Sequence, residues 1–195
     1  RTPLATIATS AYLVQNTNDE ARRQHHLETL QTQVQHLGNI LKDILSLERL
    51  EEANQTDIFE PVSLNALAEY VVEVCAAAAD TKRQQLTVLP AEPDVSISGN
   101  MNQLREALTN VVTNALSYTP EGGQITLRVL AEAARVAIEV QDTGIGITPE
   151  DMPHIFDHFY RADKARSADT GGVGLGLTIA RRIIEQHQGE ISVTS

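Results

Sequence analysis

Apolar residues in the first quarter of the chain recur at intervals of three and four positions, the spacing of a helical seam. The seam consists of Leu27, Leu30, Val34, Leu37, Leu41 and Ile44. Because these intervals follow the helical repeat, they predict a helix over residues 19–52. A shorter apolar segment at 4–14 precedes it, and the polar stretch 15–19 has the composition of a turn and N-cap. The pattern predicts an antiparallel helical hairpin.

The seam of this hairpin is narrow, so two such helices cannot form a stable core alone. We therefore predict a homodimer in which two hairpins form a four-helix bundle. Three histidines on the second helix, His25, His26 and His36, are interpreted as solvated surface residues.

After a polar linker at 53–57 the pattern changes to short strands and amphipathic helices. Predicted strands cover residues 59–62, 86–89, 95–98, 124–130, 135–141 and 190–194, and predicted helices cover 64–79, 101–116 and 174–187. We predict an α+β sandwich, with strands in one layer and helices in the other. The chain would then divide into a helical hairpin over 1–54 and a sandwich domain over 58–195.

Composition narrows the class of protein. The net charge of −11 argues against a nucleic-acid-binding or anionic-membrane-binding surface. Cys75 is the only cysteine, which excludes an intrachain disulfide and a site of several thiolates, and its apolar setting predicts burial. The sequence contains neither an apolar run of about 18 residues nor a secretory signal. It begins without methionine, so we expect a piece of a longer protein.

An acidic residue followed by two glycines ends the predicted strand at 135–141. Asp142 can accept a hydrogen bond from an exocyclic amine, and Gly144 and Gly146 allow the backbone to approach a flat ligand where a Cβ would collide. Taken alone, this pattern also describes many surface turns.

Two asparagines lie four residues apart on the predicted helix 101–116. Asn110 and Asn114 therefore share one face of that helix. Paired amides can ligate a hard cation or donate to phosphate oxygens, although two asparagines alone more often form a polar stripe.

A glycine-rich stretch runs directly into the predicted last helix. Four glycines occur within six residues, at Gly171, Gly172, Gly174 and Gly176. Backbone N–H groups at such a helix start form a cradle for phosphate. Aromatic residues at 155–161 precede a stretch at 162–170 with no apolar side chain larger than alanine, which predicts an anchored, mobile flap over a ligand.

These motifs together resemble the boxes of sensor histidine kinases, in the order and at the spacing of that family. The correspondences are Asn110-x-x-x-Asn114-Ala115 with the N box, Asp142-x-Gly144-x-Gly146 with the G1 box, Phe156-x-x-Phe159 with the F box, Gly172-x-Gly174-x-Gly176 with the G2 box and Arg1-Thr2-Pro3-Leu4 with the end of the H box. The resemblance covers essentially the whole chain. It implies a dimerisation and histidine-phosphotransfer hairpin followed by an ATP-binding domain of the Bergerat type.

The resemblance also implies roles for individual residues. Asp142 would bind the adenine amino group, Asn114 would ligate Mg²⁺ with Asn110 beside it, and Tyr118 would pack against adenine. The implied nucleotide-binding set is Asn110, Asn114, Tyr118, Asp142, Gly144, Gly146, Gly172, Gly174, Leu175 and Gly176. Thr2 would orient a water molecule for dephosphorylation of the partner.

The implied reaction is phosphorylation of a histidine by Mg·ATP, followed by transfer to an aspartate of a response-regulator receiver domain. The acceptor histidine would lie three positions before Arg1, so this chain alone is expected not to autophosphorylate. The resemblance further implies a cytoplasmic location, with membrane attachment only through segments outside this chain. In the family another pair of strands follows the position of Ser195, so an unpaired sheet edge is expected.

Two alternatives stay open at this point. The first is another Bergerat ATPase of the gyrase or chaperone type, which would lack the helical hairpin at 1–52. The second is a phosphatase-biased or degenerate nucleotide-binding dimerisation module. Ser117 keeps the second alternative open, because it stands where the family usually has lysine or arginine near the phosphates.

Overall fold

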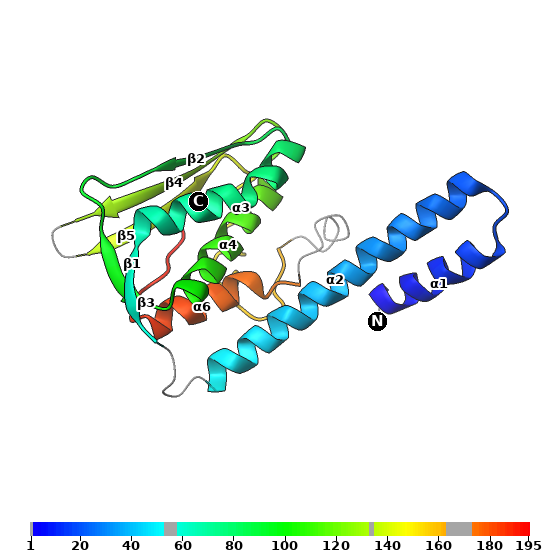
Figure 1. Cartoon of the computed structure of the whole chain (residues 1–195), viewed down its shortest axis with the longest axis horizontal. Coiled ribbons are helices and arrows are strands. Elements are labelled where there is room, and N and C mark those ends of the chain that lie inside the picture. The colour runs from blue at the N-terminus through cyan, green and yellow to red at the C-terminus, as the bar shows by residue number, and fades with distance from the viewer. Residues whose placement is uncertain (1, 53–57, 133–134, 163–172) are drawn as a thin grey trace. The chain divides into compact units, whose positions relative to one another are not determined.

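The computed structural model describes residues 2–52, 58–132, 135–162 and 173–195. The chain divides into two compact units, Arg1–Glu48 and Arg49–Ser195 (Figure 1). The predicted fold class, a helical hairpin followed by an α/β sandwich, is confirmed. The predicted domain limits stay a prediction, because the linker at 53–57 lies outside the described residues.

The first unit is a helical hairpin. Helix α1 covers Thr2–Asn16 and helix α2 covers Glu20–Glu52, with residues 17–19 as the turn between them. The Asp19 carboxylate caps α2 by accepting hydrogen bonds from the backbone N–H groups of Ala21 at 2.9 Å and Arg22 at 3.3 Å. This confirms the N-cap that the polar stretch predicts.

The second unit contains two small sheets. Strands β1 (Glu60–Ser63) and β3 (Ser96–Gly99) pair antiparallel. Strands β2 (Gln85–Leu89), β4 (Gln124–Ala131) and β5 (Val136–Asp142) form a mixed sheet in the order β2-β4-β5. The β2–β4 pair is parallel and the β4–β5 pair antiparallel, with Leu127 opposite Val88 and Val140.

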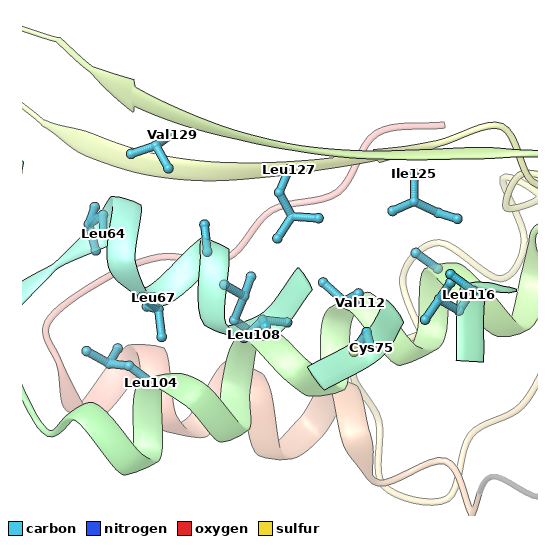
Figure 2. Close-up of a cluster of buried hydrophobic side chains, with 14 of the residues drawn as sticks. Leu64, Leu67, Cys75, Leu104, Leu108, Val112, Leu116, Ile125, Leu127 and Val129 are labelled. Atoms are coloured by element: carbon cyan, nitrogen blue, oxygen red, sulfur yellow. The ribbon is translucent and has the colours of Figure 1, made fainter. Parts of the chain in front are cut away.

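Helices α3 (Leu64–Thr81) and α4 (Met101–Tyr118) form a layer over one face of the mixed sheet, and α6 (Gly176–Gln186) packs against α4 (Figure 1). Figure 2 shows Ile125 and Leu127 pointing from the sheet toward this helix layer, where Leu108 and Val112 point into the same core. Ile125, Leu127 and Val112 are fully buried. The predicted two-layer arrangement follows from these apolar faces, because each layer can bury its own only against the other.

Polar caps fix where the two central helices begin. The Ser63 hydroxyl accepts from the N–H of Ala66 at the start of α3. The Asn100 side chain accepts from the N–H groups of Asn102 and Gln103 at the start of α4. Each cap satisfies N–H groups that the first helical turn leaves without a partner.

One predicted element is wrong: residues 190–194 do not form a strand. The burial of the side chains does alternate as a strand would require: Ile191 and Val193 are half-buried, and Ser192 and Thr194 are exposed. No ladder pairs this segment with any described strand, and alternation without a pairing partner does not make a strand. Helix α6 also begins at Gly176, two residues later than predicted.

None of the described helices is both long enough and apolar enough to cross a bilayer.

The thiol of Cys75 is part of the core, as predicted, and only 3% of the residue is exposed. Burial raises the pKa of this thiol, because the thiolate would lose its hydration. We expect a disulfide-exchange reagent at pH 8 to modify Cys75 very slowly in the native chain and rapidly in denaturant. Stopped-flow absorbance would measure both rates, and equal rates would contradict the burial.

Candidate functional site

Helix α4 carries three of the predicted site residues on successive turns of one face. Asn110, Asn114 and Tyr118 follow one another at intervals of four, and all three side chains are half-buried. The Asn110 Nδ2 atom is buried and has no hydrogen-bond partner among the described residues. A buried donor without a partner is costly, so this amide is suited to a group that the chain itself does not supply.

The start of α6 lies against Asn110. A Cβ added at Gly176 would lie 3.7 Å from the Cβ, Cγ and Oδ1 atoms of Asn110. Leu175, the N-cap residue of α6, is fully buried and provides no side-chain cap to the first turn. Within the described part of the chain no side chain caps the N–H groups of that turn, which are suited to a phosphate beside Asn110.

The loop after β5 is held against the other end of α4. The Asp142 Oδ1 atom accepts a hydrogen bond from the Gly144 N–H at 2.8 Å, and the Tyr118 carbonyl accepts from the Ile145 N–H at 3.3 Å. A Cβ at Gly144 would lie 2.8 Å from that carbonyl oxygen, too close for any side chain. Gly144 is thus required by the docking of the loop on Tyr118.

Gly146, the second glycine of the same loop, has a positive φ of 73°. The backbone N–H of Ile147 next to it donates to the Ser195 hydroxyl at 2.7 Å. Asp142 itself is exposed, and only its Oδ1 atom is committed to Gly144. Its second oxygen can therefore accept a hydrogen bond from a ligand.

Gly174 meets the aromatic segment at close range. Its φ is 80°, and an added Cβ would lie 2.5 Å from the Tyr160 carbonyl oxygen. The Gly174 carbonyl accepts from the N–H of Phe159, which itself has a positive φ of 62° and is 61% exposed. The glycine-rich stretch and the aromatic anchor, predicted separately, are therefore in direct contact.

Thr178, which no sequence motif singled out, also joins the aromatic segment to α6. Its hydroxyl, on a residue only 8% exposed, donates to the Phe156 carbonyl at 2.9 Å. The guanidinium of Arg181 lies over the Phe156 ring, 5.6 Å from its centroid. A threonine inside a helix gives no sequence signal for such a contact, because its hydroxyl more often bonds within its own helix.

Hydrogen bonds to Asp151 connect the two ends of the segment 148–160, which precedes the predicted flap. The Tyr160 hydroxyl donates to Asp151 Oδ1 at 2.7 Å, and Thr148 donates to Asp151 Oδ2, also at 2.7 Å. These hydrogen bonds lower the pKa of Asp151, the one from Tyr160 most strongly, and the same contact raises the pKa of Tyr160. Both shifts favour the pair of a neutral phenol and a carboxylate.

Removing the phenol is expected to restore the pKa of Asp151 toward that of an ordinary aspartate. The folded pKa lies below the unfolded value, so the contact adds stability above the unfolded pKa, and this is lost as pH falls through the folded pKa. NMR titration of the Asp151 carboxyl carbon in Tyr160→Phe should show the rise, and Tyr70→Phe on α3 serves as a control. An unchanged titration would show that Thr148 alone sets the shift.

Part of the predicted site lies outside the described residues. Gly172 and the flap residues 163–170 belong to that part, and so do the side-chain surroundings of Thr2, at the start of α1. The Ser117 hydroxyl donates to the Thr113 carbonyl within α4 at 2.7 Å.

The residues present fit the nucleotide and the metal that the resemblance implies. Asparagine oxygens are suitable ligands for a hard cation such as Mg²⁺. In the part of the chain that the structure describes, the buried Asn110 Nδ2 atom beside the start of α6 has no partner, and one Asp142 oxygen accepts from Gly144 while the other has no hydrogen bond. Among the described residues no group of three histidine, cysteine, aspartate or glutamate side chains could hold a metal.

Two family models match the chain. The model described as "His Kinase A (phospho-acceptor) domain" matches residues 1–53, and that described as "Histidine kinase-, DNA gyrase B-, and HSP90-like ATPase" matches residues 99–195. The chain is 35% identical to the phosphate regulon sensor protein PhoR of Pseudomonas aeruginosa, over 100% of this chain and 44% of PhoR. It is 34% identical to the sensor histidine kinase CpxA of Escherichia coli, over 97% of this chain and 40% of CpxA.

The chain thus spans less than half the length of these curated relatives. Among solved structures, the histidine kinase ThkA in complex with the response regulator protein TrrA has a TM-score of 0.77 at 22% identity, covering 97% of this chain and 52% of that one. Full-length ShkA in complex with AMPPNP has a TM-score of 0.67 at 29% identity, covering 95% and 38%.

Proposed function

Because this chain belongs to the sensor histidine kinases, we propose that it is the kinase core of a two-component sensor. Its second unit would bind Mg·ATP, and its hairpin would belong to the segment that carries the phosphoacceptor histidine. The match of the phospho-acceptor domain to residues 1–53 favours this function over a gyrase-like or chaperone-like ATPase, which the ATP-binding domain alone would leave open.

A single observation carries the proposal: one face of α4 contacts both the loop after Asp142 and the glycine-rich stretch that ends at Gly176. Asn110 contacts Gly176 at the start of α6, and Tyr118 holds the loop of Asp142 two turns further along. One end of this face offers hydrogen-bond donors suited to phosphates, and the other offers a carboxylate suited to a base. A nucleotide is the common ligand that requires both.

Each residue of the site has a proposed task. Asn114 and Asn110 would hold the metal, the α6 N-terminus would bind phosphate oxygens, and Asp142 would accept from the adenine amino group. When bound, Mg²⁺ would neutralise charge on the phosphate oxygens. ShkA, 29% identical over 95% of this chain, was solved with AMPPNP, which supports nucleotide binding by this unit. Thr2 would position water for dephosphorylation of the partner protein.

The hairpin would form a homodimer. Four of its seam residues, Leu27, Val34, Leu41 and Ile44, are between 38% and 59% exposed in the single chain. An apolar stripe of this kind along a helix requires a partner, and a second copy forming a four-helix bundle would cover it. The receiver domain of a response regulator is the second proposed partner, and the ThkA complex with TrrA supports it.

Transfer of labelled γ-phosphate from Mg·ATP tests the function. Two versions of the protein are compared: this chain, and a longer one that begins several residues before Arg1 and continues past Ser195. We expect acid-labile, base-stable label on the longer version only, and loss of that label in the longer version carrying Asn114→Ala.

The same assay distinguishes the alternatives. Absence of label on both versions, with Mg·ATP binding intact, would favour the phosphatase-biased or degenerate module. Base-stable label on this chain alone would contradict an acceptor upstream of Arg1. Full labelling of the Asn114→Ala variant would contradict the metal-binding role of this residue.

A further inference from the structure

Two side chains of the turn between α3 and β2 donate hydrogen bonds to the backbone at the end of α4. Arg83 has a positive φ of 51° and follows the C-cap of α3, so the chain reverses direction at this residue. The Arg83 side chain points to solvent, 83% exposed, and pairs with Glu121 at 2.8 Å. The residues on either side, Lys82 and Gln84, point the other way and reach the backbone of α4.

The Lys82 ammonium group caps α4. Its Nζ atom donates to the Leu116 carbonyl at 2.8 Å and to the Ser117 carbonyl at 3.3 Å, both partly buried. The last carbonyls of a helix have no partner within the helix and carry its negative partial charge, so a cation is favoured there.

The Gln84 side chain fixes the backbone that follows. This residue is 5% exposed, and its Nε2 atom donates to the carbonyls of Leu116 at 3.1 Å and Thr119 at 2.6 Å. A longer contact of 3.4 Å joins it to the Pro120 carbonyl. Since carbonyls only accept, the amide nitrogen must face them, which settles the orientation of the side chain.

Tyr118 lies in the middle of residues 116–120, the segment whose backbone Lys82 and Gln84 contact. The carbonyls of residues 116, 117, 119 and 120 accept from Lys82 or Gln84, and the Tyr118 carbonyl accepts from the Ile145 N–H of the Asp142 loop. The Tyr118 carbonyl is therefore the anchor of the Asp142 loop on α4, while the Thr143 N–H anchors the same loop on β4 by donating to the Gln124 carbonyl. Asp142 itself is held on β5 opposite Ile125, so a shift of the α4 end would move Tyr118 relative to the Asp142 carboxylate.

We propose that Lys82 and Gln84 are positioning residues for nucleotide binding, acting through the end of α4 and the loop of Asp142. This inference rests on the proposed function, because it assigns the two residues a part in the same site. Neither side chain contacts the site face formed by Asn110 and Asn114 in any hydrogen bond described for it, so their effect is exerted on geometry.

Binding of Mg·AMPPNP to single variants of the chain tests this inference. Lys82→Met removes the two hydrogen bonds from Lys82 Nζ to α4, and Arg83→Met removes the same charge from the next residue, which bonds to Glu121. Lys82→Arg keeps a cationic donor and should restore binding. Gln84→Leu is a second variant, which removes the hydrogen bonds from the Gln84 amide to the carbonyls of Leu116 and Thr119. All affinities are measured by calorimetry well below the unfolding temperature, so that loss of stability alone does not alter them.

We expect Lys82→Met to raise the Kd for Mg·AMPPNP by about three- to tenfold, and Arg83→Met and Lys82→Arg to stay within about twofold of the unaltered chain. A folded Lys82→Met variant that binds normally would overturn the inference and leave the proposed function intact. Equal weakening by Arg83→Met would also overturn it, since net charge would then be the cause. If the unaltered chain binds no nucleotide, both proposals fail.

Discussion

Replacing Asp142 by asparagine is expected to weaken the binding of Mg·ATP by about tenfold or more, while the stability of the fold is retained. The asparagine Oδ1 atom can still accept from the Gly144 N–H, so the turn after β5 keeps its hydrogen bond. The second carboxylate oxygen becomes an NH₂ group, which would face the adenine amino group donor to donor. Calorimetric titration with Mg·ATP measures the loss.

Two comparisons make this result specific. Asp142→Ala should lose both nucleotide affinity and some stability, because the Gly144 N–H then has no acceptor at this position. Asp142→Asn should also narrow the preference for ATP over GTP, since guanine offers an acceptor where adenine offers an amine. Unchanged ATP affinity in Asp142→Asn would remove this residue from the base-binding site.

Leu127→Ala is expected to lower the free energy of unfolding of the second unit by about 2–5 kcal/mol. Leu127 is fully buried on the central strand β4, and Figure 2 shows it pointing into the core shared with Leu108 and Val112. Removing three carbon atoms there leaves a cavity that the paired strands on both sides cannot close. Urea unfolding followed by far-UV circular dichroism measures the change.

Leu89→Ala is the matched control for this prediction. It makes the same substitution on the neighbouring strand β2, at a residue that is 45% exposed, and should cost less than about 1 kcal/mol. Similar losses in the two variants would indicate that strand propensity, rather than core packing, sets the stability.

The elements themselves were predictable because their causes are local. The seam from Leu27 to Ile44 recurs within a single helix, and the apolar face of α4 is visible in its own spacing. The glycines were predictable for a similar reason: Gly146 and Gly174 have positive φ, which few other residues adopt without strain. Recognition of the family rested on these motifs in their order along the chain.

The failed strand at 190–194 marks the limit of such local reasoning. Alternation correctly predicted which side chains are half-buried, but a strand also needs a neighbour to accept and donate its backbone hydrogen bonds. A single segment does not contain that information.

The sequence alone therefore determined the two parts of the chain, most of their helices and strands, and the residue types suited to nucleotide chemistry. Only the tertiary structure placed Gly176 against Asn110, docked the Asp142 loop on Tyr118, and brought Lys82 to the carbonyl of Leu116, 34 residues away. Periodicity shows which face of an element is buried, whereas the partner across that face depends on how distant elements pack together. Hydrogen bonds to backbone carbonyls are the hardest to predict, because every residue offers the same acceptor.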